Sequence, residues 1–236
     1  MLGIGGNIQN DKIPKRAYTK GSVLLDGTND YLKFDHGDGF IELISPANTN
    51  WSISYYFMVP GSGALGSAEM LTKIPNTSSY LWLNTTTGSD LHILGEYTED
   101  STSKKSINVI WDTNFVKGTW YHVVITSDGG VDNLMSTHMG TLNIGPTHFV
   151  FTNIHFDEIA VWNSVLTANE ITEIADKYPN LTQNVGDYAS SANLLRYYRM
   201  GQDKSASAIS IDDISGNRGA PLEGINAPTT STTKPY

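Results

Sequence analysis

The sequence predicts an all-β protein, a two-sheet antiparallel sandwich with one short helix. Two observations favour this class. Short runs of β-branched and aromatic residues recur along the chain and are separated by polar turn clusters, which is typical of a sandwich. Only residues 167–176 carry a clear helical pattern. The chain has 236 residues, enough for one large β domain that buries a substantial core without covalent staples.

The predicted strand with the clearest pattern covers residues 154–162. Apolar and polar residues alternate there with a period of two, and Phe156, Glu158 and Trp162 share one parity. Because both parities are apolar at residues 159–162, we expect this end of the strand to be covered on both faces.

The predicted helix follows directly. Thr167 and Glu170 have the spacing of a capping box, in which the hydroxyl accepts from an early helical N–H and the carboxylate reaches back. Ile171, Ile174 and Ala175 then fall on one side of a short amphipathic helix. Lys177 precedes Tyr178-Pro179, and the proline ends the helix.

The other predicted strands are shorter or less regular. Residues 51–58 are the exception, because every odd position is large and apolar and should face the core: Trp51, Ile53, Tyr55 and Phe57. The remaining strands are expected at residues 23–34 (as two short strands), 80–83, 91–97, 107–111, 120–126 and 194–201. Strand boundaries between residues 128 and 145 are not defined by the pattern.

Four segments together resemble laminin-G-like, concanavalin A-like jelly-roll domains. The segment Phe-Asp-Glu-Ile-Ala-Val-Trp-Asn-Ser-Val-Leu-Thr-Ala-Asn-Glu-Ile (156–171) is similar to the last core strand and following helix of that family. Leu-Leu-Asp-Gly-Thr-Asn-Asp-Tyr-Leu (24–32) resembles its opening hairpin, Trp-Ser-Ile-Ser-Tyr-Tyr-Phe (51–57) its next long strand, and Gly-Thr-Trp-Tyr-His-Val-Val-Ile (118–125) its central strand. Their order over residues 23–176 implies a jelly roll, a fold that hosts many functions.

The same resemblance implies a permuted order at the C-terminus. In many relatives a Tyr-Tyr-Arg strand and an Asp-x-Ser-Gly-Asn turn precede the opening hairpin, whereas here residues 197–199 and 213–217 follow the helix. We therefore expect the strand at 194–201 to fill a sheet position that an N-terminal strand otherwise takes. This order resembles that of tailed-phage virion proteins from marine sources. The predicted organisation is an N-terminal arm at 1–20, a jelly-roll domain at 21–219 and an extended C-terminal tail at 220–236.

Composition excludes several classes of function. The chain has no cysteine, so disulfides and thiolate chemistry are absent. Its formal net charge of −9 argues against nucleic acid and anionic membranes as partners. No run approaches the 18 apolar residues of a membrane span, and the N-terminus lacks the pattern of a secretory signal. For a complete chain, release by cell lysis within a virus particle is one way out of the cell.

Catalytic patterns do not appear in the sequence. Relatives of this fold that cleave β-glucans carry Glu-x-Asp-x-x-Glu on one strand, and this chain has no such pattern. Asp157 and Glu158 are adjacent, so on a regular strand they point to opposite faces and do not form the carboxylate pair of a glycosidase. No Gly-x-Ser-x-Gly elbow occurs. His122 matches a structural histidine of the family. We expect a protein that is not an enzyme.

A structural calcium ion is the candidate cofactor. The resemblance implies a site where the opening hairpin meets the last core strand, with Asp157 as a ligand and Asp26 or the carbonyl of Gly27 as its partner. Carboxylate and carbonyl oxygens are the donors that Ca²⁺ prefers. The alternative is that Asp157 accepts backbone N–H groups at the strand.

A sugar site is a further possibility by analogy with the family. Such a site combines aromatic platforms with polar groups, and alternation alone does not show which aromatic side chains are exposed; large aromatics in strands are more often in the core. The candidates are Tyr55, Tyr56, Trp82, Trp162, Tyr197 and Tyr198.

Two functional hypotheses follow. The first is a non-enzymatic structural protein of a tailed-phage virion, either a capsid decoration or a tail component, that displays a lectin-like module. Its partners would be other virion proteins and copies of itself. The second is a carbohydrate-binding or adhesion module that recognises cell-surface glycans. The two are compatible, since a decoration protein can also hold host glycans.

Overall fold

The computed structural model describes the sandwich and most of its helical cover. The described residues are 21–28, 30–33, 50–62, 70–75, 80–85, 91–98, 104–112, 116–128, 143–144, 153–177, 179–200, 210–217, 221–225 and 228–234. In strands β4 to β7 and in β9 the description covers the backbone. The N-terminal arm predicted at residues 1–20 lies outside the described residues.

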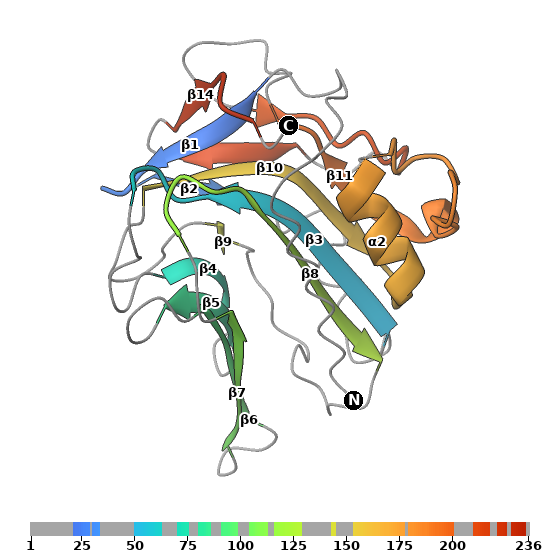
Figure 1. Cartoon of the computed structure of the whole chain (residues 1–236), viewed down its shortest axis with the longest axis horizontal. Coiled ribbons are helices and arrows are strands. Elements are labelled where there is room, and N and C mark those ends of the chain that lie inside the picture. The colour runs from blue at the N-terminus through green and yellow to red at the C-terminus, as the bar shows by residue number, and fades with distance from the viewer. Residues whose placement is uncertain are drawn as a thin grey trace.

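Strands dominate the described part of the chain, with one α-helix and one 3₁₀ turn (Figure 1). The strands are β1 (Ser22–Asp26), β2 (Tyr31–Lys33), β3 (Asn50–Met58), β4 (Met70–Pro75), β5 (Tyr80–Thr85), β6 (Leu91–Thr98), β7 (Lys104–Asp112), β8 (Tyr121–Asp128), β9 (Asn143–Ile144), β10 (Asn153–Trp162), β11 (Leu194–Tyr198), β12 (Ser210–Ile211), β13 (Leu222–Ile225) and β14 (Thr229–Ser231). The helix is α2 (Ala168–Lys177), and the 3₁₀ turn is Ser191–Asn193.

These strands form two antiparallel sheets. One has the order β14-β1-β10-β3-β8, and β11 also pairs with β10. The other has the order β12-β13-β2-β9-β4-β5-β6-β7. In Figure 1, α2 lies on the side of the six-stranded sheet that is turned away from β4 to β7. The predicted all-β, two-sheet sandwich with one short helix is therefore confirmed.

Strand β3 confirms the expected inner-face set and defines the two faces of the six-stranded sheet. Its odd positions are buried, and Tyr55 packs against Phe57 and Phe156 with ring centroids 6.2 and 6.0 Å apart. We call this the inner face. The hydroxyl of Tyr56 donates to the carbonyl of Ile174 in α2 at 3.2 Å, so the even positions form the outer face, on which the helix lies.

Strand β10 departs from the predicted alternation at one residue. Phe156 pairs with Phe57, but Ala160 pairs with Ser54, so one extra residue is inserted between Asp157 and Ala160. Glu158 has a φ of 50°, the left-handed region that residues with a side chain seldom adopt. This bulge places Phe156 on the inner face and Ala160 on the outer face, although they have the same parity. The expectation that one alternation runs through residues 154–162 is wrong for this reason.

The C-terminal segments complete both sheets. Strand β11 pairs antiparallel with residues 159–162 of β10, while β1 pairs with residues 153–156 of the same strand, so both lie along β10. Residues 222–225 and 229–231, which the sequence places in the tail, pair as β13 with β2 and as β14 with β1. Strands of three or four residues are too short to show a period, so the pattern does not reveal them.

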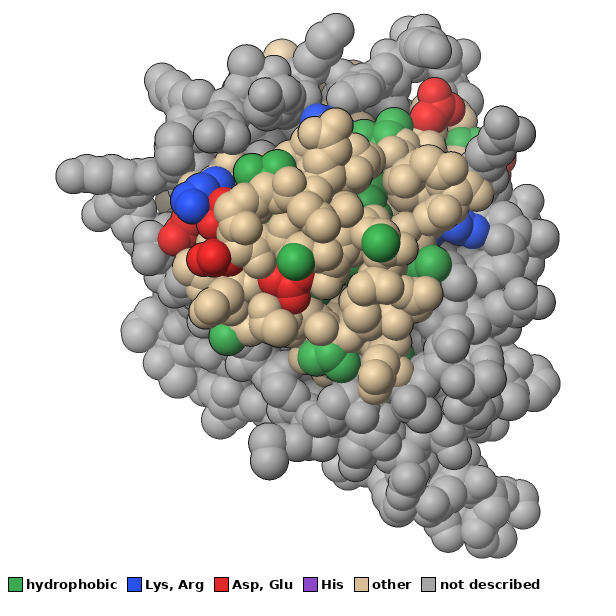
Figure 2. Space-filling model, turned by 90° about the vertical axis from the view of Figure 1, so that its right-hand side faces the viewer, with side chains coloured by type: hydrophobic (Ala, Val, Ile, Leu, Met, Phe, Trp, Pro, Cys, Tyr) green, Lys and Arg blue, Asp and Glu red, His purple; other side chains and the backbone are tan. Residues whose placement is uncertain are grey.

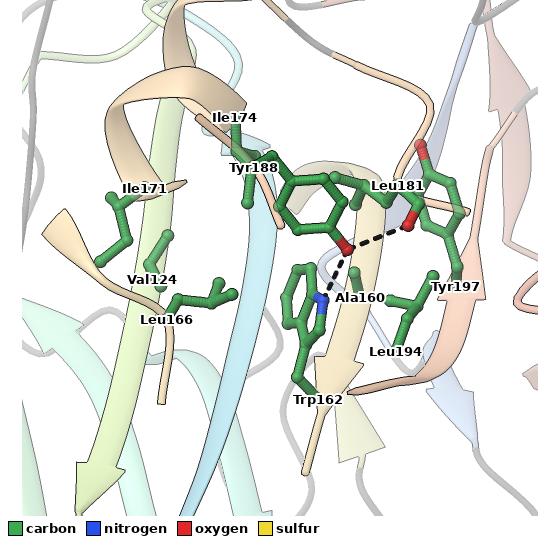
Figure 3. Close-up of a cluster of buried hydrophobic side chains, with 10 residues drawn as sticks. All are labelled: Val124, Ala160, Trp162, Leu166, Ile171, Ile174, Leu181, Tyr188, Leu194 and Tyr197. Atoms are coloured by element: carbon green, nitrogen blue, oxygen red, sulfur yellow. Dashed lines mark hydrogen bonds between the residues drawn. The ribbon is translucent and has the colours of Figure 1, made fainter. Parts of the chain in front are cut away.

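The helix packs on the outer face as part of a layer that also includes residues 179–193; we call it the helix layer. The capping box forms as predicted, because Thr167 N–H donates to Glu170 at 2.9 Å and Glu170 N–H donates to the Thr167 hydroxyl at 3.3 Å. Figure 3 shows the buried cluster beneath the layer. Its members are Val124, Ala160, Trp162, Leu166, Ile171, Ile174, Leu181, Tyr188, Leu194 and Tyr197.

Candidate functional site

A buried charged network joins the bulge of β10 to the end of β11 on the outer face. Arg199 Nε donates to Glu158 Oε1 at 2.9 Å, and Arg199 Nη2 donates to the Tyr197 hydroxyl at 2.5 Å. The Tyr197 hydroxyl in turn donates to the other carboxylate oxygen of Glu158. All three side chains are buried. The bulge thus turns Glu158 toward partners that stabilise its charge.

Electrostatics explain why this network stays charged. Burial by itself lowers the pKa of Arg199, but the Glu158 carboxylate and the Tyr197 hydroxyl outweigh it and raise that pKa above its usual value. Burial, and then the Glu158 charge, raise the pKa of Tyr197 well above 10. The guanidinium therefore stays ionised and the phenol neutral at physiological pH. The network holds β11 against β10. Neither Arg199 nor Tyr197 changes its protonation state near neutral pH.

A small cavity lies beside this network. Its volume is about 10 Å³, which is near the least that holds one water molecule. It is lined by Ser54, Tyr56, Glu158, Ile174, Pro179, Leu181 and Tyr197. The space is far too small for a sugar, so the helix layer closes this half of the outer face.

The two carboxylates predicted as calcium ligands lie apart. Asp26 pairs with Asn153 across β1 and β10, four residues from Asp157, which is roughly 13 Å along a strand. Asp157 is fully buried, and its Oδ1 accepts from the N–H groups of Glu158 at 2.8 Å and Met200 at 3.3 Å. Asp26 is exposed and accepts from Thr28 N–H at 2.7 Å. Among the described residues, no three His, Cys, Asp or Glu side chains gather around a common metal position. Calcium binding stays a prediction.

The bulge also corrects the argument that Asp157 and Glu158 point to opposite faces. Both carboxylates contact the segment after β11, Asp157 through the Met200 N–H and Glu158 through Arg199. A glycosidase pair needs carboxylates that flank an open site. Here both are buried and hydrogen-bonded to protein groups, so their closeness has a structural use.

Five of the six aromatic residues considered for a sugar platform are in the core. Tyr55, Tyr56, Trp162, Tyr197 and Tyr198 are at most 3% exposed, and the side chain of Trp82 lies outside the described residues. Among all aromatic side chains whose burial the structure describes, Trp120 alone is not buried. It was not among the predicted candidates.

A tight loop holds Trp120 at the start of β8. Gly118 N–H donates to the Val59 carbonyl at 2.8 Å, which docks the loop on the end of β3. Gly118 has a φ of 81°, and a Cβ there would lie 2.7 Å from the Gly61 carbonyl oxygen, so only glycine fits. Tyr121, the next residue after Trp120, accepts from Val116 N–H at 3.0 Å. These hydrogen bonds fix the backbone on both sides of Trp120.

Trp120 lies against His155, with ring centroids 6.0 Å apart. His155 pairs with Leu24 on one side and Met58 on the other, and Leu24 is half-buried. We call Trp120, His155, Leu24, Met58 and Ser22 the Trp120 patch. The indole Nε1 is buried and has no hydrogen-bond partner in the described part of the chain. A buried donor without an acceptor costs free energy.

The histidine in this patch is held by a chain of hydrogen bonds. The Ser22 hydroxyl lies 2.9 Å from His155 Nδ1 and donates to the Thr233 carbonyl at 2.6 Å. Burial lowers the pKa of His155, so the ring is neutral at pH 7. His122 has a different role, since its Nε2 lies 2.7 Å from the Ser54 hydroxyl, its ring stacks on Tyr56, and burial lowers its pKa to about 3. It is a structural histidine, as expected.

The surface around the helix layer is polar and mostly neutral. Figure 2 looks onto that side, and its described part is mostly tan, with acidic, basic and apolar side chains scattered over it. The exposed side chains there include Asn163, Asn169, Thr172, Gln183 and Asn184.

No helix among the described residues is long and apolar enough to cross a membrane.

Sequence reasoning missed Trp120 and the Glu158–Arg199 pair for identifiable reasons. Trp120 lies one residue before β8, where alternation no longer assigns a face, and only the preceding Gly118-Thr119 marks a turn. Arg199 lies one residue after β11, and its partner is turned toward it by a bulge that no spacing signals.

Comparisons with known proteins support the fold. No family model matches the chain, and no curated protein matches it in sequence. The structure is similar to that of a proposed carbohydrate-binding protein from Bacteroides ovatus, with a TM-score of 0.51 and 18% identity over 91% of this chain and 61% of that one. It is also similar to a protein named HCR/D-Sa-GBL1/C, with a TM-score of 0.50 and 12% identity over 92% of this chain and 59% of that one. The heptameric SAP-like pentraxin of Limulus polyphemus has a TM-score of 0.41 and 12% identity over 68% of this chain and 84% of that one.

At these identities the likeness concerns the fold. The chain spans about three fifths of the length of the first two proteins. This chain therefore has a jelly-roll-like sandwich of the kind expected from the resemblance to laminin-G-like and concanavalin A-like domains.

Proposed function

We propose that this chain is a non-enzymatic module that binds carbohydrate through the Trp120 patch. The observation that carries the proposal is the indole of Trp120, which is half-exposed while every other described aromatic side chain is buried. A flat apolar ring beside polar groups suits a sugar, which presents C–H faces for packing and hydroxyl groups for hydrogen bonds. The similarity to the proposed carbohydrate-binding protein from Bacteroides ovatus supports the same ligand class by analogy of fold.

The absence of catalysis is part of this proposal. The patch brings together a neutral histidine and Ser22, but the Ser22 proton is directed to the Thr233 carbonyl and is not shared with an activating base. A nucleophilic serine instead needs its proton taken by the histidine. The proposed module should therefore bind glycans without cleaving them.

A glycan array probed with the labelled full chain tests the proposal, followed by calorimetry on the best ligand. Trp120→Ala should weaken binding by at least about tenfold, because it removes the ring that the sugar packs on. Val185→Ala is the matched control, since it trims another exposed apolar side chain in the helix layer and should leave binding unchanged. Equal affinity of wild type and Trp120→Ala, with both variants folded, would contradict the proposed site.

A second proposal concerns where the module acts. We propose that it is displayed on a tailed-phage virion, on the capsid or the tail, as a homo-oligomer in contact with other virion proteins. The feature that favours this is the order of the chain, in which the Tyr197-Tyr198-Arg199 segment follows the helix and β11 pairs with β10. Antibody-gold labelling of particles from the source culture should show regular gold on heads or tails. Clean particles with label on cells would exclude the virion role and leave the binding proposal intact.

A further inference from the structure

We propose that the Trp120 patch selects neutral sugars over acidic ones, because a hydrogen-bond chain that starts at Thr233 presents His155 Nε2 to the ligand as an acceptor. This inference rests on the proposed function and specifies the ligand class of the same patch. The chain of bonds connects three segments that are distant in sequence: the C-terminal segment through Thr233, strand β1 through Ser22, and strand β10 through His155.

The direction of each hydrogen bond follows from proton counting. A serine hydroxyl has one proton, and a carbonyl oxygen only accepts. Because Ser22 lies 2.6 Å from the Thr233 carbonyl, its proton is directed there. The hydroxyl oxygen then accepts from His155, so Nδ1 carries the imidazole proton. A neutral imidazole has a single N–H, and Nε2 is left with a lone pair.

That lone pair has no partner in the described part of the chain. His155 makes its one hydrogen bond within the described chain through Nδ1. Its ring lies against Trp120, whose buried indole N–H has no hydrogen-bond partner among the described residues. The patch therefore holds one unused acceptor, His155 Nε2, beside a flat ring. A sugar hydroxyl can donate its proton to that nitrogen while the sugar packs on the ring.

An anionic group is disfavoured at the same position. A carboxylate or sulfate at neutral pH has no proton to donate. Its oxygen lone pair would therefore repel the lone pair of Nε2. The elements that pair with His155 contribute Ser22, Leu24 and Met58, none of which is charged. The net charge of −9 adds unfavourable long-range electrostatics for an acidic glycan.

The test compares neutral methyl hexosides with the corresponding methyl hexuronides, or neutral with sialylated glycans of the same core, by calorimetry at pH 7.5. Wild type should bind the neutral member at least about tenfold more tightly, as expected for one matched against one mismatched hydrogen bond. His155→Gln keeps an acceptor but adds an amide donor that an acidic group can accept from. The affinity for the neutral ligand should then exceed that for the acidic one by about threefold or less. His155→Leu removes the acceptor and should weaken neutral-sugar binding about tenfold.

Controls separate the possible failures. His122→Gln makes the same change at another histidine of the outer face, one that is half-buried, and it should leave the ratio of affinities unchanged. Ser22→Ala removes the positioning hydroxyl and should reduce the same ratio. Nitrogen-15 chemical shifts of His155 report its tautomer directly and should show Nδ1 protonated in wild type and a mixture in Ser22→Ala.

The outcomes are distinguishable. If wild type binds no glycan of either kind, the proposed function fails and this inference fails with it. If wild type binds acidic glycans as tightly as neutral ones, or if His155 is protonated at Nε2, the binding function stands and the inference about its ligand class is overturned.

Discussion

The helix layer and the Trp120 patch lie on the same face of the same sheet, yet they treat buried polar groups in opposite ways. Beneath the helix layer, Trp162 Nε1 donates to the Tyr188 hydroxyl at 2.9 Å, which donates to the Leu181 carbonyl at 2.9 Å (Figure 3). In the Trp120 patch the equivalent indole N–H has no partner among the described residues. The indole N–H of Trp162 therefore has a hydrogen-bond acceptor within the chain, whereas that of Trp120 has none among the described residues.

The difference teaches where a binding function can be placed on a sandwich of this kind. The helix layer that covers one half of the sheet face supplies partners for the Trp162 indole and the Tyr188 hydroxyl, and the remaining cavity of about 10 Å³ holds at most one water. The half without that helix keeps a half-exposed ring beside a histidine. The helix layer contributes mainly to stability, whereas the Trp120 patch keeps an acceptor, His155 Nε2, that the described residues do not use. Mutations should affect folding in one and binding in the other.

The largest effect on folding should come from breaking the buried ion pair. Arg199→Met removes the guanidinium and leaves the Glu158 carboxylate buried without its countercharge. We expect a loss of about 3–5 kcal/mol in the free energy of unfolding, measured by urea denaturation with an unchanged m-value. The double replacement of Arg199→Met with Glu158→Gln should recover part of that loss, because no uncompensated charge then remains. A loss below about 1 kcal/mol for Arg199→Met would show that the pair is not buried in solution.

A matched pair of tryptophan substitutions sharpens the comparison directly. Trp162→Phe removes the donor to Tyr188 and leaves a gap in a packed cluster, so it should cost about 1–3 kcal/mol. Trp120→Phe makes the same chemical change where the N–H has no partner, and it should cost less than about 1 kcal/mol. Urea denaturation of both variants in parallel gives the two values. Equal costs would mean that the two regions do not differ as described.

The smallest effect concerns the acid stability of the helix layer. Burial raises the pKa of Glu170, but hydrogen bonds from Ser190, Thr167 and Ala189 outweigh it and hold that pKa below 4.5. A depressed pKa stabilises the fold fully above the unfolded value of 4.5, and that contribution is lost as the pH falls through the folded pKa. Glu170→Gln should therefore lower the melting temperature at pH 7 and show a smaller decrease below pH 4.5. Parallel slopes for the two proteins in thermal melts would contradict this.

Local pattern was sufficient for much of the fold. Four large apolar residues at odd positions of β3 predict the inner face because a strand has a period of two, and neighbouring strands do not change that period. The spacing of Thr167 and Glu170 predicts the helix start because both bonds of a capping box lie within one turn. The short strands β13 and β14 carry too few residues for any pattern, and only their partners reveal them.

What the sequence determined by itself was the class of fold, the inner face of β3 and the start of α2, because each depends on interactions between residues close in the chain. The tertiary structure decided the site. The bulge at Glu158 forms where its carboxylate meets Arg199, forty-one residues away, and it reverses the faces of the strand beyond it. The tautomer of His155 depends on Ser22 and Thr233, which are far apart in sequence. Contacts of this range leave no periodic trace, so only the folded chain shows them.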